Sequence, residues 1–260
     1  MAARTLNMTE GKPLKLIVVF AMPLMLGNVF QQLYTVVDTM IVGQALGVGA
    51  LAALGAADWL NWMVLSTVQG FAQGFSIRMS HEFGAGTYDK LRKTVANSIL
   101  LAAFSSVLLL VISQAVARPI LELLQTPDEI IGNSLIYLRI MFAGIPVVMA
   151  YNILASILRS LGDGKTPLYA MQVCSGVFCL AAILRLPILT FSKEDFRMEG
   201  RLCLHLMKLG LPMAFQNAII SVGGMIVQFV VNGFGVLFIA GFTATNKLYG
   251  ILEVAAISYG

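Results

Sequence analysis

One acidic residue, Asp38, lies in an otherwise apolar stretch, 23–55, that is long enough to cross a lipid bilayer. An ionisable side chain in hydrocarbon costs roughly 2.5 to 3.5 kcal/mol even on lenient insertion scales, so it normally faces a bundle interior or a wet cavity. A carboxylate placed there can take up a proton or coordinate a cation. We therefore expect Asp38 to be an ion site. The alternative is that it lies near the lipid boundary, or bonds a neighbouring helix, and only fixes packing.

Other polar residues accompany this carboxylate at helical spacing. At 3.6 residues per turn, one side of the helix carries a polar stripe made of Asn28, Gln31, Thr35 and Asp38. Tyr34 lies beside the stripe, where it could stack on a cationic compound or anchor the helix at the membrane interface. The stripe is a candidate lining of a chamber inside the membrane.

The composition is that of a membrane protein with several spans. Of 260 residues, 58% are hydrophobic and 12% charged, and the mean hydropathy is +0.84. The net charge of +4 comes from Lys and Arg residues that lie mostly between apolar blocks, which is a topology signal and excludes nucleic-acid binding. The three cysteines have no His or acidic companions, so we expect no metal site, and no constellation within the spans indicates an enzyme.

Apolar blocks predict an all-α bundle of seven membrane helices, at 15–42, 50–79, 93–117, 131–160, 167–185, 203–232 and 236–260. In the second block, the small residues Gly70 and Gly74 predict a close helix contact, and Gly84 and Gly86 end the helix. Lys and Arg residues alternate between connections in a way that fits a cytoplasmic N-terminus.

The chain also contains an internal repeat. A shift of 189 residues places Pro212 on Pro23 and Asn217 on Asn28, and a proline removes a backbone donor, so we expect a helix bend at both prolines. The second copy carries its own polar stripe, for which Asn217, Ser221 and Gln228 are candidate cavity-lining residues. Its counterpart of Asp38 is Val227, so the two copies are chemically unequal.

The repeat and the charge pattern disagree with the helix count. Two parallel repeats require an even number of helices before the second begins, and this sequence offers five. Two basic connections flank a single apolar stretch near Val173, which predicts an internal deletion of about 25 to 45 residues, given a 20-residue span. We expect an incomplete N-terminal lobe at 1–190, a cytoplasmic linker at 191–202 and the start of a C-terminal lobe at 203–260.

The motifs PLMLGNVFQQLYTVVDTMIVGQALG, YLRIMFAGIP, LRSLGDGKTPL, LGLPMAFQN and ATNKLYG, in this order, resemble the multidrug and toxic compound extrusion (MATE) family. The resemblance implies a twelve-helix, two-lobe secondary transporter of the plasma membrane that exports cationic, lipophilic compounds in exchange for H⁺ or Na⁺. Asp38 matches the family's coupling aspartate, and Pro23 the proline at which the first helix bends.

The sequence departs from that family in one place. Similar members carry an Asn-x-x-x-Asp pair on the fifth helix, and no Asn or Asp occurs within 168–184. The coupling site would then be incomplete, and the chain could be an inactive fragment or a non-functional relic. A lipid-linked precursor flippase of the same superfamily is a further alternative. The sequence leaves open the coupling ion, the substrate, and the oligomeric state.

Overall fold

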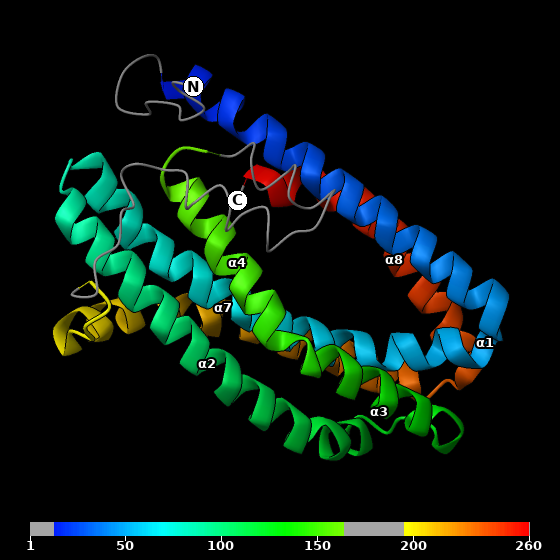
Figure 1. The fold of residues 1–260 in the computed structure, drawn as a ribbon. Coiled ribbons are helices and arrows are strands. Elements are labelled where there is room, and N and C mark those ends of the chain that lie inside the picture. The colour runs from blue at the N-terminus through cyan, green and yellow to red at the C-terminus, as the bar shows by residue number, and fades with distance from the viewer. Residues whose placement is uncertain (1–12, 164–194, 260) are drawn as a thin grey trace. The chain divides into compact units, whose positions relative to one another are not determined.

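Residues 13–163 and 195–259 are described in a computed structural model, with side chains for 28–163 and 195–250, and every regular element among them is a helix (Figure 1). The order and bounds are α1 Pro13–Gly84, α2 Tyr88–Leu123, α3 Asp128–Ala143, α4 Ile145–Ser160, α7 Gly200–Asn232 and α8 Val236–Tyr259. The prediction of an all-α fold is confirmed. The expected span at 167–185 and the deletion near Val173 lie outside the described residues.

Helix α1 covers the first two predicted spans, which are separated by a sharp break at Gly47 (Figure 1). Gly47 has φ 83° and ψ −179°, a conformation that side chains with a Cβ rarely adopt. Seventy-two residues of continuous helix would be about 108 Å long at 1.5 Å per residue, far more than a bilayer's thickness. The glycine therefore converts one long apolar segment into two helices of membrane-spanning length.

Three of the described helices are long and apolar enough to cross a membrane, namely the 28–84 part of α1, together with α2 and α7. Helices α3 and α4 pass the same test only as a pair, joined at Gly144, and cover the fourth predicted span. The chain is thus a multi-pass membrane protein. Helix α1 ends at Gly84, and Gly86 has φ 69°, as the predicted glycine break requires.

The chain divides into two compact units. The first unit comprises Met1–Leu24, Thr67–Leu108 and Pro146–Gln216, and the second comprises Met25–Ser66, Leu109–Ile145 and Asn217–Gly260. Both units contain segments from both copies of the repeat, so they differ from the two lobes that the repeat predicts. The division into lobes and linker stays a prediction.

The second unit has a core built mainly from small residues of α1 and apolar residues of α7 and α8. Its buried members are Ala52, Ala53, Ala56, Ile130, Val231, Ile239 and Ala240. Ser134 on α3 donates a hydrogen bond of 2.9 Å to the carbonyl of Ala53. A Cβ at Gly55 would lie 1.7 Å from Thr243 Oγ1, so the absence of a side chain there lets α8 approach α1.

The first unit contains a second close contact, between α1 and α7. A Cβ added at Gly74 would lie 2.4 Å from the Cα of Gly210, and one at Gly70 would lie 2.7 Å from the backbone of Ala214. Distances this short mean that the two backbones touch. The close packing predicted from Gly70 and Gly74 is confirmed, and α7 is the partner.

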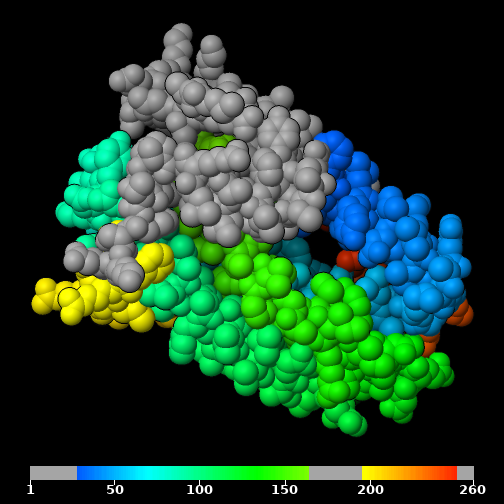
Figure 2. All heavy atoms as spheres, in the orientation of Figure 1, coloured from blue at the N-terminus to red at the C-terminus, as the bar shows by residue number. Residues whose placement is uncertain are grey.

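The outward-facing side chains of the described helices are largely apolar. On α2 and α3 the exposed side chains include Phe104, Val107, Val111, Leu123, Ile136 and Ile140. The green atoms at the surface in Figure 2 belong to α2, α3 and α4. An apolar exterior of this kind suits contact with lipid, because hydrocarbon offers no partner to polar groups.

Candidate functional site

The second unit holds a cavity of about 300 Å³ between α1 and α8. It is lined by Val36, Thr39, Met40, Gly43, Gln44 and Leu51 of α1 and by Ala244, Lys247 and Leu248 of α8. The described lining residues are mostly apolar, with one threonine, one glutamine and one lysine. Among these described residues, Lys247 is the only one with a charged side chain.

The ammonium of Lys247 pairs with a carboxylate on α1. Its Nζ donates to Asp58 Oδ2 at 2.6 Å, and the two side chains are 16% and 35% exposed. On the same side of α8, Gln32 Nε2 donates to the backbone carbonyl of Lys247 at 3.1 Å. Gly250 makes room for this amide, because a Cβ there would lie 2.1 Å from Gln32 Nε2. Two polar contacts therefore fix α8 against both halves of α1.

Asp58 and Lys247 come from corresponding parts of the two copies of the repeat, but they are not equivalent positions. In this region the copies are offset by 188 residues, as the positive φ angles of Gly47 (83°) and Gly235 (87°) show. The counterpart of Asp58 is therefore Asn246, the residue before Lys247. Sequence reasoning missed this pair.

The polar stripe containing Asp38 lies on the other side of α1. At about 100° per residue, Asp38 is roughly opposite Val36 and Met40, which line the cavity. Asp38, Gln31 and Tyr34 are exposed. The stripe and the cavity thus occupy separate faces of one helix.

The remaining members of the stripe are partly buried. Asn28 and Thr35 have intermediate exposure, and Thr35 Oγ1 donates to the carbonyl of Gln31 at 3.0 Å. The polar groups of the stripe therefore follow the helix as the spacing predicts. The roles assigned to Asp38 as an ion site and to the others as chamber lining stay predictions.

The second polar stripe forms hydrogen bonds within the second unit. Asn217 Nδ2 donates to the carbonyl of Ser66 at 3.1 Å, and the hydroxyls of Ser66 and Ser221 are 3.4 Å apart. Gln228 Nε2 donates to Asn232 Oδ1 at 2.7 Å. Asn217, Ser221 and Gln228 do not line the cavity described above, and their role as chamber-lining residues stays a prediction. Pro23 and Pro212 lie inside α1 and α7, and the bend expected at each also stays a prediction.

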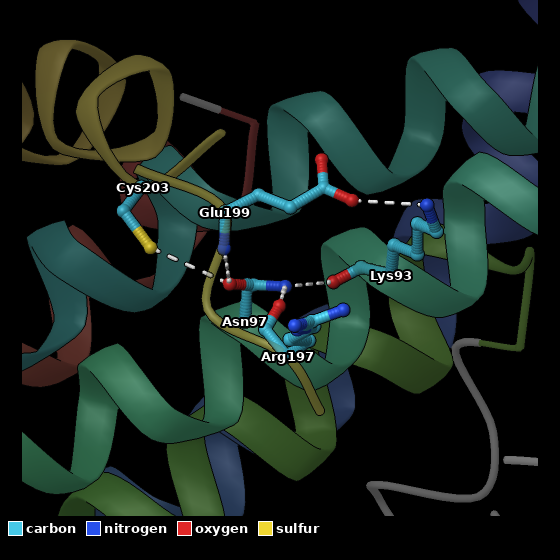
Figure 3. Close-up of polar contacts among 5 residues, drawn as sticks. All are labelled: Lys93, Asn97, Arg197, Glu199 and Cys203. Carbon is cyan, nitrogen blue, oxygen red and sulfur yellow. Dashed lines mark hydrogen bonds and ion pairs between the residues drawn. The ribbon is translucent and has the colours of Figure 1, made fainter. Parts of the chain in front are cut away.

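In the first unit, Asn97 on α2 holds the segment that leads into α7 (Figure 3). Its Nδ2 donates to the carbonyls of Lys93 at 2.9 Å and Arg197 at 3.3 Å. Its Oδ1 accepts from the backbone N–H of Glu199 at 3.1 Å and from Cys203 Sγ at 3.4 Å. The side chain is fully buried, so these contacts satisfy it. Sequence reasoning missed this anchor, because nothing in the spacing links residues 100 apart.

An ion pair lies over the same junction. Lys93 Nζ donates to Glu199 Oε1 at 2.9 Å, and both side chains are about half exposed (Figure 3). An exposed pair adds little stability by itself. Together with the buried Asn97 it ties the start of α7 to the start of α2, which is a structural role.

Comparison with known proteins identifies the family. The MatE family profile matches residues 23–183 of this chain, more than half of its length. The chain is 27% identical over 286 residues to the probable multidrug resistance protein YpnP and 26% identical over 281 residues to the probable multidrug resistance protein YoeA, both of Bacillus subtilis (strain 168). These alignments include 98% and 93% of the chain. The chain spans 64% and 61% of the length of these relatives.

Solved structures with a similar fold include a MATE transporter. The solved structure of the MATE multidrug transporter DinF-BH superposes with a TM-score of 0.81, covering 99% of this chain and 66% of that one, at 17% identity. This similarity concerns the helical architecture. The match of the family profile to more than half of the chain establishes that the protein belongs to the MATE family.

Proposed function

We propose that the chain represents the first lobe and the beginning of the second lobe of a cation-coupled exporter. The exporter would carry lipophilic cations out of the cell in exchange for inward H⁺ or Na⁺, across the plasma membrane and with its N-terminus in the cytoplasm. Membership of the MATE family and two relatives named as probable multidrug resistance proteins support the transport class.

The observation that carries the coupling proposal is Asp38, an exposed carboxylate on the polar side of a helix that belongs to a membrane protein. Protonation or cation binding changes its charge by one unit. Such a change shifts the equilibrium between two packing arrangements of the helix only if the two arrangements differ in how well they solvate the charge. The hydroxyl and amide oxygens of Thr35 and Gln31, beside it on the stripe, are of the type that coordinates Na⁺.

We further propose that an internal segment is absent from this chain relative to its relatives. The alignment with YpnP is 286 residues long, whereas 98% of the 260-residue chain is about 255 residues, so about 31 aligned positions have no counterpart here. That number falls within the deletion of about 25 to 45 residues expected near Val173 from a 20-residue span and its loop. A chain without that helix would lack part of the coupling site.

Export by the 260-residue chain is tested in cells whose own drug pumps have been removed. Accumulation of rhodamine 6G is measured with the chain, with Asp38→Asn, and with Glu129→Gln, which removes an exposed acid at the start of α3 and serves as the matched control. Export that depends on a proton or sodium gradient, that Asp38→Asn abolishes and that Glu129→Gln leaves intact, would support the proposal.

Two other results would count against it. Equal export by Asp38→Asn and the unaltered chain, at equal amounts in the membrane, would remove Asp38 from the coupling role. Absence of export by the chain in cells where full-length YpnP exports the dye would mean that these 260 residues are not a transporter on their own.

A further inference from the structure

We propose that the cavity between α1 and α8 is a binding site for a lipophilic anion, whose carboxylate is held by Lys247 in competition with Asp58. This inference goes beyond the proposed export of cations. It concerns a different face of α1 and a ligand of opposite charge. Binding measurements alone test it, and it involves no transport step.

The cavity's lining sets the ligand's chemistry. Val36, Met40, Leu51 and Leu248 offer aliphatic surface to a hydrocarbon or aromatic body. A volume of about 300 Å³ is at the small end of ligand cavities, which suits a body of one or two rings. Among the lining residues whose side chains are described, Lys247 is the charged one, and its ammonium attracts an anion and repels a cation.

The ammonium of Lys247 has more N–H donors than Asp58 accepts. An ammonium group carries three N–H donors, and Asp58 Oδ2 accepts one of them. Within the part of the chain whose side chains are described, no other hydrogen bond from Lys247 Nζ occurs. The proposal requires that a ligand carboxylate in the cavity reaches this ammonium, sharing it with Asp58 or displacing that residue.

Asp58 is the internal competitor. It holds Lys247 at 2.6 Å but does not itself line the cavity. An anion that binds Lys247 weakens this ion pair and hence the contact between α1 and α8. Removal of the Asp58 charge should strengthen the binding of the anion, because the ammonium then lacks its protein partner.

The test measures binding of three isosteric probes to the full chain in phosphatidylcholine nanodiscs. The probes are 2-naphthoate, 2-naphthamide and 2-naphthylmethylammonium, which carry negative, zero and positive charge on the same ring system. The unaltered chain should prefer the naphthoate over the amide, with the ammonium compound weakest. Asp58→Asn should raise the affinity for naphthoate about tenfold and leave the affinity for the amide unchanged.

The decisive variants change Lys247. Lys247→Met should abolish the preference for naphthoate over the amide, whereas Lys247→Arg, which keeps the charge, should preserve it. Arg139→Gln is the matched control, since it removes an exposed cation of α3 in the same unit that does not line the cavity. Unchanged naphthoate affinity in Lys247→Met, or no gain in Asp58→Asn, would overturn the proposal.

A lipid headgroup or a dissolved acid could supply the same negative group. Replacing about a third of the phosphatidylcholine by phosphatidylglycerol distinguishes the two sources. Suppression of naphthoate binding by phosphatidylglycerol in the unaltered chain indicates a lipid headgroup as the natural ligand. Unchanged binding indicates a dissolved anion. Both results support the site, provided that the dependence on Lys247 holds.

Discussion

The ammonium of Lys247 lies 2.6 Å from a carboxylate oxygen of Asp58, which joins α8 to the second half of α1. The opposite charges of the two side chains attract each other across this helix contact. The pair thus fixes the register of α8 on the second half of α1.

Breaking this pair should lower the stability of the protein. Asp58→Asn and Lys247→Met should each reduce the free energy of unfolding by roughly 1 to 3 kcal/mol, between the values for exposed and buried pairs, because the side chains are partly exposed. The double variant should lose less than the sum of the two single losses. Equilibrium unfolding of the four proteins in one detergent measures the coupling energy.

The control for that cycle is an exposed pair on α2. Arg118 and Glu122 are 2.8 Å apart, with side chains 70% and 55% exposed. Replacing Arg118 by Gln should change the unfolding free energy by less than about 0.5 kcal/mol, the value for i,i+4 helix pairs. A coupling energy near zero for Asp58 and Lys247 would contradict the role assigned to them.

Gly47 should tolerate no side chain, although nothing lies near it. A Cβ there would meet no atom within 4 Å, but φ is 83°. Gly47→Ala should therefore lower the unfolding free energy by about 1 to 3 kcal/mol through backbone strain alone. The neighbouring Gly49 has equal space and no such φ, so Gly49→Ala should be neutral or stabilise by about 0.5 to 1 kcal/mol.

Equal effects of the two glycine substitutions would mean that the break in α1 is not at Gly47. Both variants can be compared by equilibrium unfolding. The distance between spin labels placed on either side of the break provides a second measurement, because straightening of α1 would lengthen it.

Gly74 should tolerate no side chain for a different reason, which is the contact with α7. A Cβ 2.4 Å from the Cα of Gly210 would force the two helices apart, and overpacking of this kind costs typically about 1 to 3 kcal/mol. Gly74→Ala should therefore destabilise the protein. Gly223→Ala, on α7 with no atom within 4 Å, is the control and should not. Unfolding of Gly74→Ala at the same denaturant concentration as its control would argue against the contact.

Asn97 should stabilise the start of α7. Asn97→Ala removes the partners of the Glu199 N–H and the Arg197 carbonyl, and an orphaned buried polar group costs about 1 to 3 kcal/mol. The thiol of Cys203 should then react faster with a maleimide, measured with Cys174 and Cys179 replaced by Ser. Asn152→Ala is the control, because that side chain donates to Val148 in its own helix.

If Cys203 reacts equally fast in Asn97→Ala and in Asn152→Ala, the anchor does not hold the start of α7. A loss of unfolding free energy without faster labelling would place the effect within α2 alone. The two measurements together therefore separate an anchor from a local helix contact.

Among the described residues, the sequence predicted where the helices lie and one of their contacts. Apolar blocks of about 20 residues are specified locally, because lipid requires each span to satisfy its own backbone. The contact at Gly70 and Gly74 was also predictable, since small residues four apart are a local signal. The predicted spans 15–42 and 50–79 placed a break between them, but Gly43, Gly47 and Gly49 all lie there, and nothing in the sequence says which of them carries the break.

The candidate site could be predicted only in part. The stripe with Asp38 follows from helical periodicity, and its polar residues lie along one side of α1 in the structure. The pair of Asp58 and Lys247 and the anchor at Asn97 join segments 189 and 100 residues apart, and periodicity within one helix carries no information about such contacts.

The contact between residues 58 and 247 also bears on the order in which the protein can assemble. The two residues are 189 positions apart, so a nascent chain that has not reached residue 247 leaves Asp58 without this partner. The ion pair can therefore form only after synthesis has reached α8.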